Sequence, residues 1–312
     1  MYWDNNSGTI SNAVIEAFHL DTSLLVSSSV SDTSNFRIFY EIESALSDVD
    51  RSKFSWKSLE DFKYTKSRGQ SSTDNKDFQR TLAAFEALGM KKHLEDIQRL
   101  LSAILNLGNI EFSNGSEISN LDQLKITAEY LGLDKTTLQS ILTSKTLSAG
   151  GSTRTKLVSA ETARWRRDTL AKDIYNRLFR WIHGQCNVCL QDVASSSDFK
   201  DYYVGVLDFP GFAESESEGS SLSRLLMNYA SERFQKFYNE KIFTAEMEKY
   251  KQEKLKYQKI EFNNNDTVVK LMDSQQRPEG LFSQLEALAS RSTGASAAQE
   301  AAFLTKLETI QL

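Results

Sequence analysis

Apolar residues recur at helical spacing in several long segments of the chain. Residues 77–90 and 93–109 keep apolar side chains three or four positions apart, which predicts two amphipathic helices in succession. The segment 128–142 predicts two short helices joined at Gly132, and a strongly helical pattern starts at Asp168. A very long helix is predicted from about Leu222 to Lys259, with a second half that is almost entirely charged and should project into solvent or along an edge.

Strand-like and loop-like patterns are few. Residues 202–212 (YYVGVLDFPGF) predict a strand that ends in Asp208 and is followed by a Pro-Gly turn. Residues 108–117 predict a short strand and turn. The stretch 144–167 is basic and rich in Ser, Thr and Gly, and its composition predicts a mobile surface loop. The fold class is therefore helix-dominated α/β, with few strands and no internal repeat.

Composition narrows the class of protein. The length of 312 residues suggests about two domains. The sequence contains only 2 prolines, and long helices require such a low content because an interior proline breaks a helix. The net charge of −5 argues against general nucleic-acid binding. The longest apolar stretch, 100–110, is too short to span a bilayer, so a membrane role would need a partner or a region outside this sequence. Two cysteines make no disulfide framework and no signal peptide is visible, so we expect a cytoplasmic protein.

One short motif predicts a ligand-binding site. An aspartate at a strand end before a glycine turn is the arrangement of a nucleotide-phosphate sensor, in which the carboxylate holds Mg²⁺ through water. Asp208 would take that metal-binding role, and the backbone N–H of Gly211 would contact the phosphate of a bound Mg-nucleotide. The plainer interpretation, a turn-capping aspartate, stays open on these residues alone.

Longer motifs indicate a family. The segment 228–243 (NYASERFQKFYNEKIF) resembles the relay helix of the myosin head, and 204–212 (VGVLDFPGF) resembles its switch II. Residues 34–42, 93–112 and 170–187 are similar, in the same order, to successive elements of the head's central region. The segment 279–307 is similar to the start of the lower actin-binding helix-loop-helix.

This resemblance implies the central part of a myosin-type P-loop NTPase head, with long helices. It divides the chain into an upper central helical part (1–200), a switch II-like strand with a relay-like helix (201–260) and the start of a lower actin-binding part (261–312). Both ends look abrupt, so we expect a fragment of a longer protein. A complete parent would use Mg-ATP, whereas we expect no cofactor for the fragment.

The sequence also departs from the family pattern. No G-x-x-x-x-G-K-[ST] phosphate loop occurs in it, and the order of the elements leaves the switch I serine and arginine outside it. The glutamate that ends switch II in the family is replaced by Ala213, which cannot form the ion pair that closes the site. Pro210 further restricts the same loop. Slow or absent ATP hydrolysis is therefore expected.

The actin-facing side is altered too. Active myosin heads resemble one another in having a hydrophobic tip at this helix-loop-helix. The corresponding residues 288–299 (LASRSTGASAAQ) are small and polar here, which predicts weak affinity for actin filaments. A basic cluster could still attract acidic actin by long-range charge, although a solvated surface loop is the plainer interpretation. The cluster comprises Arg154, Lys156, Arg164, Arg166 and Arg167.

Three hypotheses follow. The leading one is a non-motile, motor-like module that binds actin, nucleotide or both without efficient ATPase, as in the motor-like head of a fungal chitin synthase that tethers or delivers vesicles. It would act at the cytoskeleton or at the cytoplasmic face of secretory vesicles or the plasma membrane. The second is an ATP-driven, actin-based myosin motor whose phosphate loop and switch I lie outside this sequence. The third is a chain that does not fold.

Overall fold

The computed structural model consists of two compact units, Met1–Val206 and Leu207–Leu312. The structure describes residues 2–3, 10–18, 20–26, 35–66, 75–113, 117–149, 152–190, 203–209, 211–212, 222–277, 279–291 and 305. The boundary between the units falls within the segment that resembles switch II. We describe each unit by itself.

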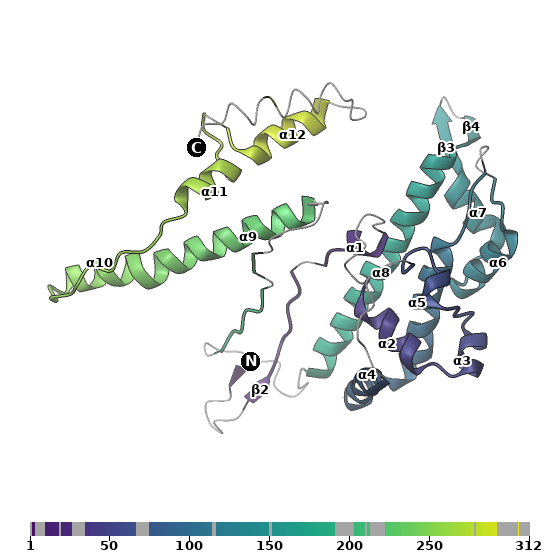
Figure 1. The fold of residues 1–312 in the computed structure, drawn as a ribbon, viewed down its shortest axis with the longest axis horizontal. Helices are drawn as coiled ribbons and strands as arrows, with labels where there is room; N and C mark the ends of the chain where they lie inside the picture. Colours follow the sequence, from purple (N-terminus) through teal and green to yellow (C-terminus); the bar gives the residue numbers. More distant parts are fainter. Residues whose placement is uncertain are drawn as a thin grey trace. The chain divides into compact units, whose positions relative to one another are not determined.

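Helix α5 (Leu94–Gly108) forms the centre of the first unit. It packs against α6 (Leu121–Tyr130) and against the long helix α8 (Ala160–Leu190), which runs beside it in Figure 1. Ile104, Leu105 and Leu107 are fully buried. The apolar period that predicted a helix at 93–109 therefore produces the core of the unit. This prediction is confirmed.

Shorter elements surround α5. The predicted helix at 77–90 is confirmed, as are the two short helices joined at Gly132, which takes φ +66° as a chain reversal between helices requires. The remaining elements are β1 (Tyr2–Trp3), β2 (Ile10–Asn12), α1 (Ser23–Val26), α2 (Arg37–Ala45), α3 (Asp48–Lys53), a 3₁₀ turn (Leu59–Asp61), α4 (Asn75–Ala87), a second 3₁₀ turn (Lys91–His93) and α7 (Lys135–Thr143).

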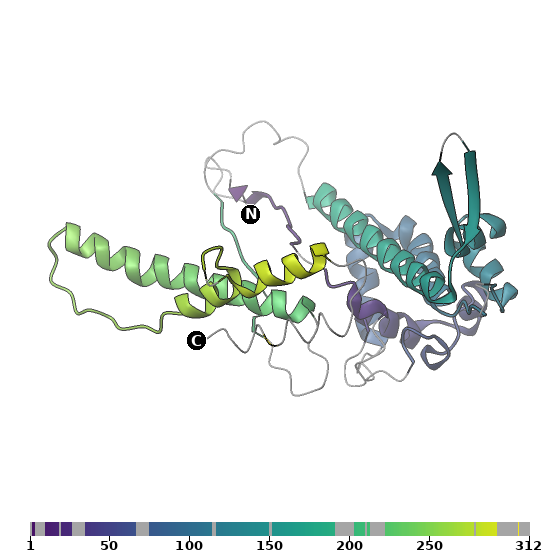
Figure 2. The same cartoon turned by 90° about the horizontal axis from the view of Figure 1, so that it is seen from above.

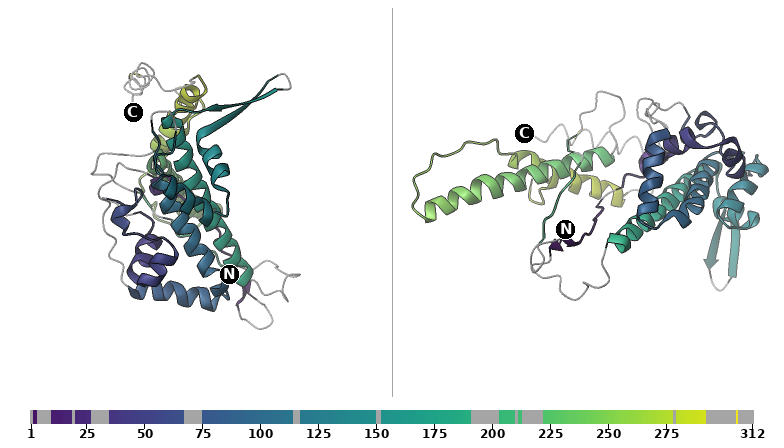
Figure 3. Two further views of the ribbon diagram at one scale, coloured as in Figure 1. Left: turned by 90° about the vertical axis from the view of Figure 1, so that its right-hand side faces the viewer. Right: turned by 90° about the horizontal axis from the view of Figure 1, so that it is seen from below.

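The stretch 144–167 is not a loop, so this prediction was wrong. Strands β3 (Ser144–Ala149) and β4 (Ser152–Leu157) pair antiparallel in a hairpin, and α8 starts three residues later. Figures 2 and 3 show the hairpin projecting beyond the helices of the first unit. Threonines on both strands suit this structure because β-branched side chains favour extended backbone. The strand predicted within 108–117 is reduced to an isolated bridge between Phe112 and Ile118.

A close contact fixes the loop before α4 against α5. The ring of Tyr64 lies over Gly108, where an added Cβ would come within 2.7 Å of it. The Tyr64 hydroxyl donates a 2.6 Å hydrogen bond to Asp168 Oδ1 on α8, 104 residues away. Burial, together with the Asp168 carboxylate, raises the pKa of Tyr64 well above its usual range. The phenol is therefore neutral and joins three separate segments.

The second unit is built on a continuous helical rod. It consists of α9 (Leu222–Tyr238), a π-helical turn (Asn239–Thr244) and α10 (Ala245–Gln252), followed by α11 (Asp266–Asp273) and α12 (Leu281–Arg291). The predicted long helix is thus confirmed in its first half but ends at Gln252 rather than near Lys259. Lys254 adopts φ +56°, a left-handed conformation that stops the helix.

Tertiary contacts explain the early end of the rod. The segment after α10 returns along it, and Phe262 stacks on Phe243 with ring centroids 5.0 Å apart. Asn239 Nδ2 donates to the carbonyl of Asn263, and Lys236 forms a 2.6 Å ion pair with Asp266. These bonds hold residues 253–265 outside a helix, although their charged composition would favour one.

Candidate functional site

The switch II-like segment belongs to no strand. Within the described residues 204–209, none pairs in a ladder, so the prediction of a strand ending in Asp208 was wrong. A strand needs a neighbour to satisfy its backbone groups, and in the described part of the chain no strand pairs with these residues. Pro210 and Ala213, which the sequence singled out in this segment, lie outside the described residues, as does most of 288–299.

The proposed phosphate sensor consists of one exposed and one half-buried residue. Asp208 is exposed, and Gly211 is half-buried. Gly211 takes φ +75°, and a Cβ at this position would meet nothing within 4 Å. The glycine is therefore required by the turn rather than by crowding, and its surroundings leave room for a close approach to the backbone. The roles of Asp208 and Gly211 toward Mg-nucleotide stay predictions.

An apolar pocket lies beside this segment. Its volume is about 620 Å³, and Gly211 and Phe209 line it together with aromatic residues of α9. Phe209 packs on Phe234, with ring centroids 5.0 Å apart. Asp208 does not line the pocket. Within the described ranges, no three His, Cys, Asp or Glu side chains gather where they could hold a metal ion.

The basic cluster is divided between the hairpin and α8. Arg154 and Lys156 lie on β4, and Lys156 is exposed. Lys145 of β3, also exposed, is the direct cross-strand partner of Lys156. Two like charges in such a pair repel each other and weaken the hairpin. An acidic partner would relieve that repulsion. The sequence analysis missed Lys145 because it predicted a loop, in which cross-strand pairs do not exist.

Three arginines of the cluster lie on the first turns of α8. Arg166 Nη1 donates to the carbonyl of Ser144 at 2.6 Å, which ties α8 to the base of the hairpin. Arg164 is exposed and donates a longer bond, 3.3 Å, to the carbonyl of Phe112. Both guanidinium groups therefore have structural contacts to backbone carbonyls in addition to any contact with a partner.

Arg167 does not belong to an actin-facing surface. Its side chain is 2% exposed, with Nη1 donating to the carbonyl of Ile110 at 2.8 Å and Nε to Asp168 Oδ1 at 2.9 Å. Its placement in the surface cluster is corrected: a side chain this deeply buried cannot contact a filament. The buried charge is tolerated because Asp168 pairs with it. Arg154, Lys156, Arg164 and Arg166 remain predicted actin contacts.

A model of the myosin head (motor domain) family matches residues 2–311. The chain therefore belongs to the myosin head family. Among the described residues, no helix has both the length and the apolar character needed to cross a membrane.

Curated relatives include myosins and a chitin synthase. The chain is 30% identical over 295 residues to the myosin-I heavy chain of Dictyostelium discoideum, covering 90% of this chain and 12% of that protein. It is 34% identical over 206 residues to unconventional myosin ID of Drosophila melanogaster, covering 64% and 20%. It is 31% identical over 290 residues to chitin synthase 8 of Mycosarcoma maydis, covering 89% and 14%. The chain thus spans a quarter or less of the length of these relatives.

Proposed function

We propose that this chain is a non-motile, motor-like binding module that associates with actin filaments, nucleotide or both and lacks efficient ATPase activity. The observation that carries the proposal is Ala213, which stands where the resemblance implies the glutamate of switch II. An alanine provides no carboxylate for the charge-assisted bond that would hold the closed state. Asp208 and Gly211 are retained, so the segment keeps its candidate groups for Mg²⁺ and phosphate but not the closing pair.

The hairpin supports the actin part of the proposal. Lys145 and Lys156 form an exposed like-charge pair on a projecting element. Such a pair favours an acidic surface and acts through long-range, salt-sensitive attraction. The likeness to chitin synthase 8 supports a parent in which the module tethers or delivers vesicles along the cytoskeleton, whereas the likeness to the myosins supports the alternative of an ATP-driven motor.

Cosedimentation with actin filaments, with and without Mg-ATP, tests the proposal on the purified chain once a cooperative melt has shown that it folds. We expect weak, salt-sensitive binding that Lys145→Glu/Lys156→Glu lowers and that Mg-ATP does not release. Lys125→Glu, at an exposed lysine on α6, reverses one charge outside the hairpin and should leave binding unchanged.

Phosphate release by the complete parent protein separates the two candidate functions, because the motor alternative places the phosphate loop and switch I outside this sequence. The binding module predicts the same slow release with and without actin. Actin-activated phosphate release, or release from actin by Mg-ATP that Asp208→Ala abolishes, would overturn the module and favour the motor.

A further inference from the structure

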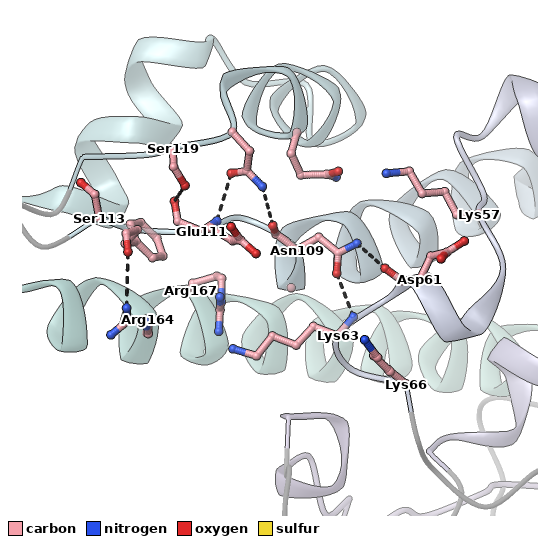
Figure 4. Close-up of a pocket in the computed structure, with 14 residues that line it drawn as sticks. Lys57, Asp61, Lys63, Lys66, Asn109, Glu111, Ser113, Ser119, Arg164 and Arg167 are labelled. Atoms are coloured by element: carbon pink, nitrogen blue, oxygen red, sulfur yellow. Dashed lines mark hydrogen bonds between the residues drawn. The ribbon is translucent and has the colours of Figure 1, made fainter.

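A second pocket, in the first unit, has a strongly basic lining. It encloses about 760 Å³ between the loop before α4, the end of α5, the loop before α6 and the start of α8. Figure 4 shows the side chains of these four segments converging on it. Its five cationic side chains face two anionic ones, Asp61 and Glu111. The cationic residues are Lys57, Lys63, Lys66, Arg164 and Arg167.

Asp168 pairs with the Arg167 guanidinium, so the excess positive charge that is not neutralised within the described part of the chain comes from the three lysines and Arg164. No described carboxylate forms an ion pair with Lys57, Lys63 or Lys66, and all three lysines are exposed. In Figure 4, Lys63 extends toward Arg167 across the pocket. Partial burial and the nearby Arg167 guanidinium lower the pKa of Lys63. A bound anion would relieve this repulsion between neighbouring cations.

The walls of the pocket are held in place before any ligand arrives. Asn109 accepts a bond from Lys63 N through Oδ1 and donates through Nδ2 to the carbonyl of Asp61, both at 2.8 Å. Asn120 similarly bonds the carbonyl of Asn109 at 2.7 Å and the backbone N–H of Glu111 at 3.0 Å. The two asparagines therefore fix three segments relative to one another. Binding would then order little except the lysine side chains.

We propose that this pocket binds a compact polyphosphate, a small molecule with several phosphate groups and no aromatic base. Its volume suits a small ligand rather than a single phosphate. Phe112 is the one aromatic residue of the lining, so the pocket offers no pair of ring faces for a nucleobase. Ammonium, guanidinium and amide groups supply the charge-assisted hydrogen bonds that phosphate oxygens accept. The site is independent of the Asp208 turn and of the hairpin lysines.

Calorimetric titration of the full chain with inorganic tripolyphosphate tests the site. We expect saturable binding that weakens with salt, and a Kd raised by about tenfold or more in Lys63→Glu/Lys66→Glu, because each reversal replaces attraction by repulsion. Lys125→Glu reverses one charge outside the pocket, half of the change in the double variant, and should alter the Kd less than about twofold at moderate salt. Thermal melts show whether each variant is folded, and both sites of substitution are exposed.

Equal affinity of the wild type and Lys63→Glu/Lys66→Glu would overturn the proposal. An equal loss in Lys125→Glu would also overturn it, because general charge would then explain the binding. Soluble inositol trisphosphate and vesicles containing the corresponding phosphoinositide identify the source of the phosphates. Binding to the vesicles that depends on Lys63 and Lys66 assigns a lipid headgroup, whereas binding confined to the soluble compounds assigns a free polyphosphate.

Discussion

The two units of the chain use apolar residues differently. In the first unit, α5 and its neighbours bury Leu, Ile and aromatic side chains in one contiguous core. In the second, Val269 is the one apolar residue among those described that is fully enclosed, and Phe237 of α9 is 57% exposed. Large exposed apolar surfaces mark places where proteins bind other surfaces. The difference teaches that helical periodicity predicts a helix in both units, but predicts a core only where a second layer covers the apolar stripe.

Core truncation should give the largest effect and the clearest difference between the units. Leu105→Ala removes a fully buried side chain and is expected to cost about 2–5 kcal/mol of unfolding free energy. Phe237→Ala on the exposed rod should change it by no more than about 0.5 kcal/mol. Urea denaturation followed by far-ultraviolet circular dichroism reports on the helices of both units, and tryptophan fluorescence recorded beside it reports on the first unit, because Trp3, Trp56, Trp165 and Trp181 all lie there. Similar effects of the two variants would remove the distinction.

Glycine replacement should give the next largest effect, and it tests the close packing of the Tyr64 ring on Gly108. Gly108→Ala drives a Cβ against the Tyr64 ring and is expected to cost about 1–3 kcal/mol through overpacking. Gly184→Ala in α8, where an added Cβ would meet nothing within 4 Å, is the matched control and should stabilise the helix by about 0.5–1 kcal/mol. The same fluorescence titration compares them. A neutral Gly108→Ala would mean that the ring moves aside freely.

The buried phenol predicts a pH dependence. Tyr64→Phe loses the bond to Asp168 and should cost about 0.5–1.5 kcal/mol at neutral pH. The raised pKa of Tyr64 means that the folded state holds its proton more tightly than the unfolded state does. The resulting stability is complete below about pH 10 and is lost as the pH rises further. Wild type and Tyr64→Phe should therefore converge above pH 10 in paired urea titrations, and parallel curves would contradict this.

The hairpin should give the smallest effect. Lys145→Thr removes the repulsion opposite Lys156 and supplies a residue suited to a strand. We expect a gain of about 0.2–1 kcal/mol at low salt, which decreases as salt screens the repulsion between the two lysines. Thermal melts at two ionic strengths measure it, with Lys125→Thr as the control outside the hairpin. A gain that is independent of salt would assign the effect to strand propensity instead.

Local signals predicted much of the fold. The helices at 77–90, 93–109 and 128–142 follow from apolar spacing and from Gly132, all readable within one or two turns. The hairpin was missed because its Ser, Thr and Gly content also suits a loop. Only the pairing between the two strands distinguishes a hairpin from a loop with this composition. The end of the long helix was missed because contacts such as Phe243–Phe262 override a charged, helix-compatible sequence.

The candidate sites were less predictable. The motif around Asp208 could be located from the sequence, whereas its lack of a strand depends on neighbours that a motif does not describe. The sequence predicted Arg167 to be a surface cation, because the contacts that bury it come from distant parts of the chain. Its guanidinium donates to the carbonyl of Ile110, and its neighbour Asp168 accepts a bond from Tyr64. The basic pocket joins residues 57–66 with 108–123 and with α8, so no local pattern could indicate it.

The π-helical turn at Asn239–Thr244 changes the phase of the rod. A π turn accommodates one residue more than an α turn, so side chains after it are rotated by about 100° relative to an uninterrupted α-helix. A helical period read along α9 therefore cannot be extended unchanged into α10, because each residue after the π turn takes the angular position that an uninterrupted α-helix would give to the residue before it. Removing one residue here would rotate every side chain of α10 by about 100° relative to those of α9, so this short segment determines which residues of α10 share a face with Phe234 and Phe237.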